Sequence, residues 1–303
     1  MDLSRISYYL IDIGSITLAI SFVLFVIHTT LLAAGGRVTA AGAGGRVATA
    51  TAGGPNLVIG RRDATAAGGM GQAFAWASLV LLGLGMLIRA YLVGRGPFGN
   101  LYEFTVAFAF GIVLAYLFLG RRYPIRSIAF LPTGVSFFLL AYAFTLPHQI
   151  SPLVPALDNP PLLTLHVSMA MLSYGIFSVS FAAAVGYLIQ GRENRVAWLP
   201  SAKVLDEVAY RAVIIGFPIF ATLIILGSWW ASIAWGRYWG WDPKETAALV
   251  TWLIYAVYLH ARNQRGWVGR PSALILIVGF AAVLFTYLGG NLFFGGLHSY
   301  AGV

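Results

Sequence analysis

The segment 235–246 is dense in aromatic side chains and lies between two long apolar runs. It begins Trp-Gly-Arg-Tyr-Trp-Gly-Trp, so Trp235, Trp239 and Trp241 are close together, and Gly236 directly follows the first of them. Tryptophan joins a large apolar ring to a polar N–H group and favours the boundary between membrane and water. Three such rings in one short loop would form a broad, flat wall. The segment is therefore predicted to bind a flat, apolar ligand.

Two of the five histidines are predicted to lie on the same membrane face as this loop. His166 opens an apolar run, and His298 lies in the tail that follows the last apolar run. Imidazole nitrogens ligate iron and indole faces cover a porphyrin, so this combination suggests a haem site. For either histidine alone, interfacial anchoring or a hydrogen bond to a backbone carbonyl is the alternative.

The other three histidines lead to different interpretations. His260 and His28 lie near the opposite, cytoplasmic ends of their apolar runs, and ionisable residues inside membranes are usually functional. We interpret His260 as a ligand for iron at this inner level. For His28, ligation and a hydrogen bond to a neighbouring helix stay equally open. His148, in an outward loop, is interpreted as a spectator.

Residues 242–245, Asp-Pro-Lys-Glu, have the pattern of a helix start. Aspartate is favoured at the N-cap, proline at the first helical position and glutamate at the third. Asp242 is therefore expected to cap the helix that follows the Trp-rich segment. Such a capped helix start would hold Trp239 and Trp241 rigidly beside a ligand.

The composition is that of an integral membrane protein. Of the 303 residues, 59% are hydrophobic and only 10% are charged. The absence of cysteine excludes disulfides, thiolate metal sites and cysteine nucleophiles. The formal net charge of +9 does not indicate nucleic-acid binding, because no basic cluster is interleaved with base-stacking aromatic residues.

The apolar runs predict an all-α fold, a polytopic bundle of about eight transmembrane helices. The expected spans are 8–34, 73–93, 101–119, 128–146, 165–190, 213–235, 246–261 and 272–290. Most of the 19 Lys and Arg residues lie in the loops after the first, third, fifth and seventh spans. Basic loops stay in the cytoplasm, so both termini and the loop 235–246 are expected outside.

The whole chain, 1–303, is interpreted as one integral membrane domain. Residues 35–72 differ from the rest in being rich in alanine, glycine and threonine. This composition cannot bury a core of its own, and it favours a flexible cytoplasmic linker.

Segment 235–246 resembles the Trp-rich WWD signature of the haem-handling protein family, in the form WGxxWxWDPKET. Four further segments resemble its CcsA/ResC branch, the subunit of the system II cytochrome c synthetase: 100–103, 165–168, 258–262 and 296–300. The resemblance runs from about Phe98 to Tyr300. Residues 35–72 match nothing in this family.

The resemblance implies a subunit that moves haem b across the membrane and holds it for attachment to the Cys-x-x-Cys-His motifs of apocytochrome c. It implies His166 and His298 as external axial ligands and His260 as the ligand of haem in the membrane. It implies an external platform made by Trp235, Trp239, Trp241 and Asp242. The partner would be a CcsB/ResB subunit. The resemblance attributes the second membrane ligand of haem to that partner, which weakens the interpretation of His28 as a ligand. The complex would act as a holocytochrome c synthase in a bacterial cytoplasmic or thylakoid membrane.

Three alternatives stay open. A system I type protein would share the Trp-rich loop but deliver haem to a covalent chaperone. A secondary transporter of another aromatic or anionic solute would use its histidines as proton relays. In a membrane scaffold, the tryptophans would only anchor the chain at the interface. Arg89 and Arg95 are candidate partners of haem propionates, and Glu103 is a candidate acid or base by position alone.

Overall fold

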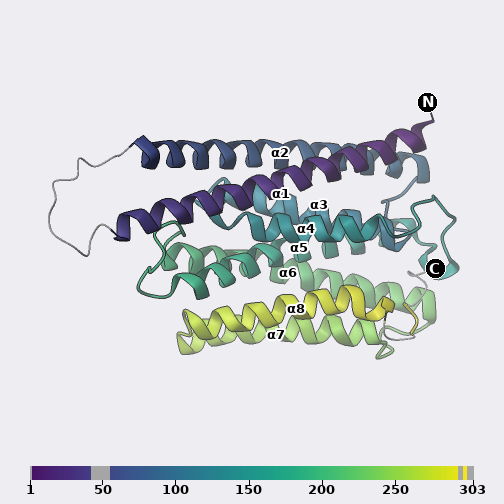
Figure 1. Ribbon diagram of the computed structural model, residues 1–303. Coiled ribbons are helices and arrows are strands. Elements are labelled where there is room, and N and C mark those ends of the chain that lie inside the picture. Colours follow the sequence, from purple (N-terminus) through teal and green to yellow (C-terminus); the bar gives the residue numbers. More distant parts are fainter. Residues whose placement is uncertain (1, 42–54, 293–295, 299–303) are drawn as a thin grey trace.

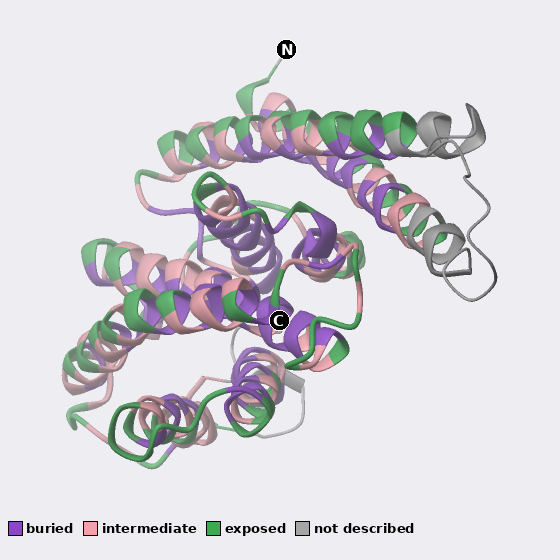
Figure 2. Ribbon diagram, turned by 90° about the vertical axis from the view of Figure 1, so that its left-hand side faces the viewer, coloured by how far each residue is buried: buried purple, intermediate pink, exposed green. Residues whose placement is uncertain are grey.

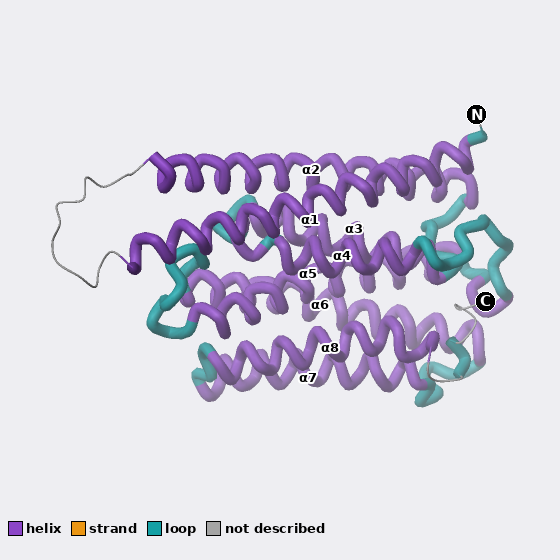
Figure 3. Tube along the Cα trace, in the orientation of Figure 1, coloured by secondary structure: helices purple, strands orange, loops and turns teal. Residues whose placement is uncertain are grey.

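The computed structural model describes residues 2–41, 55–292 and 296–298. These residues form eight α-helices and two short 3-10 helices, with no strand among them (Figures 1 and 3). The predicted all-α fold is therefore confirmed. The elements are α1 (Leu3–Ala41), α2 (Pro55–Val93), α3 (Leu101–Gly120), η2 (Arg126–Ile128), α4 (Phe130–Ala143), η3 (Pro155–Leu157), α5 (Pro160–Gln190), α6 (Ala202–Trp235), α7 (Pro243–Arg265) and α8 (Arg270–Leu292).

Within the described residues, seven helical segments are long and apolar enough to cross a membrane, as expected of an integral membrane protein. They are Leu3–Ala34, Arg62–Val93, Leu101–Gly120, Arg126–Ala143, Pro160–Gln190, Ala202–Trp235 and Arg270–Gly289. The predicted span 246–261 lies in α7, which is helical but is not among the seven. Charged residues at its ends, such as Glu245 and Arg262, leave a shorter apolar stretch between them.

Helices α1 and α2 form a long hairpin beside the other helices (Figures 1 and 2). Serine side chains of each helix donate to backbone carbonyls of the other: Ser21 to Gly71 at 2.7 Å, and Ser78 to Gly14 at 2.8 Å. Glycine at these contacts lets two helices approach closely in lipid.

The stretch 35–72, expected to be a linker, is helical up to Ala41 and again from Pro55. Residues 62–72 pack against α1, because their alanines and glycines suit close helix contact as well as they suit a linker. Residues 42–54 lie outside the described residues. The cytoplasmic location of the stretch stays a prediction.

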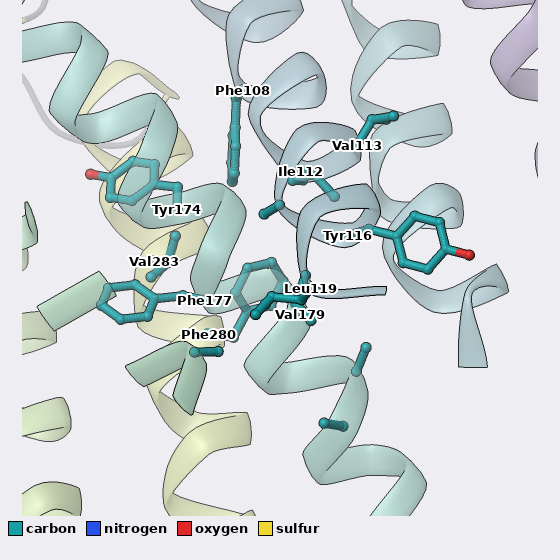
Figure 4. Close-up of a cluster of buried hydrophobic side chains, with 14 of the residues drawn as sticks. Phe108, Ile112, Val113, Tyr116, Leu119, Tyr174, Phe177, Val179, Phe280 and Val283 are labelled. Atoms are coloured by element: carbon teal, nitrogen blue, oxygen red, sulfur yellow. The ribbon is translucent and has the colours of Figure 1, made fainter. Parts of the chain in front are cut away.

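The core is centred on α3 and α5, which pack against each other and against α8. Figure 4 shows aromatic and aliphatic side chains of these three helices meeting in one buried cluster, including Phe108, Phe177 and Phe280. Nearer the middle of the contact, Gly175 of α5 lies directly on the backbone of Gly111 of α3. A Cβ atom on Gly175 would collide with the carbonyl oxygen of Gly111, which cannot move without bending α3.

We therefore expect Gly175→Ala to destabilise the bundle by about 1–3 kcal/mol, the usual penalty for overpacking. Gly69→Ala in α2 is the matched control, since nothing lies within 4 Å of its added methyl group. The thermal unfolding midpoint of the detergent-solubilised chain should fall for Gly175→Ala and hold or rise for Gly69→Ala. Equal midpoints would contradict this close contact.

Candidate functional site

A cavity of about 1150 Å³, its open mouth included, lies at the end of the bundle where α6 ends and α7 begins. The walls come from the starts of α3 and α5, the second half of α6, the start of α7 and the segment 296–298. His166, Trp230, Trp235, Trp239, Lys244 and His298 all line it.

The end of α6 and the loop after it supply the aromatic wall. Helix α6 stops at Trp235 because Gly236 takes a left-handed conformation with φ 71°, which glycine adopts without strain. Beyond it, the Ser228 hydroxyl donates to the backbone carbonyl of Tyr238 at 2.8 Å and holds the loop back on α6. Trp235 and Trp239 thereby face the cavity.

Trp241 does not line the cavity, although the sequence grouped it with Trp235 and Trp239. Trp241 is 69% exposed, and its ring contacts that of Trp239 edge-on, with centroids 5.9 Å apart. Trp230 takes a place that the sequence did not assign: it is buried at 9% exposure beside His166. The feature of the sequence that could have identified Trp230 is the adjacent pair Trp229 and Trp230 near the end of an apolar run.

Asp242 is the N-cap of α7, as expected, and its capping box is complete. Its side chain accepts from the Lys244 amide at 3.0 Å, and the Glu245 carboxylate accepts in return from the Asp242 amide at 3.1 Å. Asp242 also holds the C-terminal segment, because it accepts from the Leu297 amide at 2.6 Å and lies 2.7 Å from Nδ1 of His298. One carboxylate therefore fixes both the Trp-rich loop and His298.

Asp242 stays ionised over a wide pH range. Burial alone would raise its pKa, but the hydrogen bond and charge of His298, with the Lys244 and Leu297 amides, lower it to about 2. A lowered pKa means that this stabilisation is complete above the ordinary value of 3.8 and is lost as the pH falls through about 2. At neutral pH the carboxylate is a permanent hydrogen-bond acceptor.

His166 is held in the same way from the other side of the cavity. Its Nδ1 lies 3.0 Å from the Leu223 carbonyl, and its ring meets Trp230 edge-on with centroids 5.7 Å apart. Gly227 makes room for the ring, since a Cβ atom there would lie 2.7 Å from Cε1 of His166. Neither of these contacts with α6 could be predicted from the sequence.

The hydrogen bonds place the lone pair on the same atom in both histidines. A carbonyl and a carboxylate accept, so Nδ1 of His166 and of His298 donates, and in the neutral imidazole Nε2 keeps the lone pair. Metal-ligating histidines usually have this outer hydrogen bond, which fixes the tautomer and orients the ring. Each ring therefore keeps an unprotonated Nε2, the form in which an imidazole can ligate iron.

Within the described residues, no group of three or more His, Cys, Asp or Glu side chains is arranged to hold a bare metal ion. Two imidazoles are nevertheless sufficient for a haem, because the porphyrin supplies the other four nitrogen ligands. The two imidazoles of this cavity are therefore compatible with iron held in a porphyrin.

The remaining histidines lie elsewhere. His28 is buried between α1 and α2, with Nδ1 2.6 Å from the Ala64 carbonyl, so it makes the helix–helix hydrogen bond that was one of its two interpretations. His148 stacks on Tyr8 with ring centroids 4.4 Å apart. His260 is exposed near the end of α7 and is not among the residues that line the cavity.

Arg89 and Arg95, the candidate propionate partners, are bound to Glu103 instead. The Nε atom of Arg89 lies 2.6 Å from one carboxylate oxygen of Glu103, and Nη1 of Arg95 lies 3.5 Å from the other. Glu103 also accepts from the Gly99 amide at 2.6 Å. This buried cluster fixes the α2–α3 turn, whose residues Phe98 to Leu101 form one wall of the cavity.

Glu103→Gln should therefore destabilise the protein by about 3–5 kcal/mol, because it leaves buried arginine charge without its counterion. Glu193→Gln is the matched control, since Glu193 pairs with Arg195 where both side chains are at least 65% exposed. An exposed pair contributes at most about 1 kcal/mol. Thermal unfolding in detergent compares the two, and an equal shift in both variants would contradict the buried cluster.

Comparisons with known proteins agree on one family. Residues 98–298 match the family described as cytochrome C assembly protein. The cytochrome c biogenesis protein CcsA of Synechococcus sp. (strain CC9605) is 35% identical over 247 residues, which cover 71% of this chain and 81% of that protein. The CcsA protein of Synechococcus elongatus (strain ATCC 33912 / PCC 7942 / FACHB-805) is 35% identical over 299 residues, covering 81% and 89%.

Among solved structures, the cytochrome c haem lyase CcmF superposes with a TM-score of 0.59. The superposition covers 95% of this chain and 47% of that chain, so this chain spans about half its length. At 18% identity this likeness shows a shared fold.

Proposed function

Because the chain belongs to the cytochrome c assembly protein family, in its CcsA branch, and acts in cytochrome c biogenesis, we propose that it presents haem b for covalent attachment to apocytochrome c. The observation that carries this proposal is that His166 and His298 line one cavity, beside Trp230, Trp235 and Trp239. Haem is the substrate. The two imidazoles ligate its iron, and the indole rings cover its apolar surface.

The reaction forms two thioether bonds. Each cysteine thiol of a Cys-x-x-Cys-His segment adds across one vinyl group of haem, the sulfur bonding to one vinyl carbon and the hydrogen ending on the other. No oxidant or reductant is consumed in this addition. The thiols come from the apocytochrome, in keeping with the absence of cysteine in this chain. The chain's contribution is to hold the haem at a fixed position so that the vinyl groups are within reach.

The inner histidine belongs to an earlier step of the same proposal. His260 lies on the exposed face of α7, in line with Val250, Leu253 and Val257. The His260 imidazole would bind haem on the outside of the bundle, and a CcsB/ResB subunit would supply the second imidazole. Haem then crosses to the cavity on the outer face of the membrane. The arginine-rich loops at the opposite end support an outer location for the cavity.

The test is maturation of a reporter cytochrome in a bacterial strain that lacks this chain and is complemented by its variants. The wild-type chain, with its partner subunit, should restore a reporter that keeps haem after denaturation. The His166→Ala, His298→Ala double variant should give an apocytochrome without covalent haem. Normal maturation in the double variant would contradict the proposal, whereas haem trapped on a separate chaperone would indicate the system I activity.

A further inference from the structure

The cavity has one basic side chain among the described residues that line it, Lys244. Arg89 and Arg95 are absent from this lining and are bound to Glu103. Haem b carries two carboxylates on one edge and two vinyl groups elsewhere on the ring. A cavity that presents a single ammonium group to such a ligand can distinguish its two edges.

Lys244 lies in the first turn of α7, where the helix dipole favours an anion. The carboxylates of Asp242 and Glu245, close to it in the sequence, are both engaged by backbone amides: Asp242 by Lys244 and Leu297, and Glu245 by Gly240 and Asp242. Their charge is therefore partly compensated by the helix start and the loop.

Another part of the cavity lining is apolar. Phe98, Leu157, Leu163 and Val167 line it and belong to one buried hydrophobic cluster with Trp230. A carboxylate placed against this part of the lining would be desolvated without a partner, which is strongly unfavourable, whereas a vinyl group would lose nothing. The lining therefore favours a carboxylate near Lys244 over one against these apolar side chains.

We propose that Lys244 binds a propionate carboxylate of haem at the start of α7. This inference rests on the proposed haem-presenting function and deepens it. Lys244 is then a positioning residue, which selects porphyrins that carry free carboxylates.

Lys244 keeps its charge at neutral pH in the chain alone. Burial lowers the pKa of its ammonium group to about 8, while the Asp242 carboxylate acts in the opposite direction. A carboxylate ligand would favour the charged form further, because an opposite charge at short range raises the pKa of an amine.

The test compares two probes, iron protoporphyrin IX and its dimethyl ester, each titrated into the purified chain in detergent and followed by Soret absorption. The wild-type chain should bind the diacid at least about tenfold more tightly, the size of effect expected for a charge-assisted hydrogen bond. Lys244→Met should lose most of this preference by weakening diacid binding alone. Lys244→Arg should retain it.

Lys203→Met is the matched control, because Lys203 is exposed at the start of α6 and is the other lysine of the chain. It should leave both affinities unchanged. Equal affinity of the wild-type chain for the diacid and the ester would overturn the role of Lys244 while leaving haem binding intact. Failure of the wild-type chain to bind either porphyrin would overturn the proposed function itself.

Discussion

His166→Ala is expected to convert the bound haem from a low-spin form with two imidazole ligands to a high-spin form with one. The reason is local: His166 comes from α5, its Nδ1 is tied to the Leu223 carbonyl, and Nε2 is left to bind iron. No other described histidine lines the cavity except His298. Absorption spectra of the haem-loaded chain should show the change, and reporter cytochrome c maturation should fall at least about a hundredfold, beyond the loss typical of an outer hydrogen-bond partner.

His148→Ala provides the matched control for this prediction. His148 lies in the loop before α5, and its ring stacks on Tyr8 outside the cavity. The Arg89 side chain bonds to its backbone carbonyl, which alanine retains. The spectrum and maturation of this variant should match the wild type. A low-spin spectrum in His166→Ala would show that the iron has other ligands.

Asp242→Asn is expected to weaken haem retention about 10–100-fold, although Asp242 is not itself a proposed ligand of the iron. The ionised carboxylate accepts from Nδ1–H of His298 at 2.7 Å and so keeps the lone pair on Nε2. An asparagine amide group can donate to Nδ1 instead, which favours the tautomer with the hydrogen on Nε2. His298 would then be present but unable to ligate iron.

Two comparisons separate this tautomer effect from a general loss of structure. Asp158→Asn changes an exposed aspartate in the loop before α5 and should leave haem retention unchanged. Asp242→Ala removes the cap as well and should cost about 1 kcal/mol of stability in addition. If Asp242→Asn retains haem as the wild type does, the carboxylate does not control His298.

Residue chemistry allowed the sequence to predict much of the site. Two histidines and a dense Trp segment lie far apart in the sequence, at 166, 298 and 235–246. They could be assigned to one membrane face because the arginine-rich loops identified the opposite one. The Asp242 cap was predictable since its signal lies within four consecutive residues. Seven of the eight expected spans lie in described helices long and apolar enough to cross a membrane, and the prediction of an all-α fold is confirmed.

Contacts between helices could not be predicted in this way. The exposure of Trp241 depends on a left-handed backbone at that residue, with φ 56°, which its sequence context does not require. The pairing of Arg89 and Arg95 with Glu103 depends on how α2 turns into α3. The helical packing of residues 62–72 depends on the partner face of α1, because Ala-rich and Gly-rich stretches serve as linkers and as close helix contacts alike.

The most direct measurement is an experimental structure of the haem-loaded chain with its partner subunit. We expect a porphyrin in the cavity between α5, α6 and α7, with its iron bonded to Nε2 of both His166 and His298. A porphyrin bound elsewhere on the outer face, or an iron that lacks either of these two bonds, would contradict it.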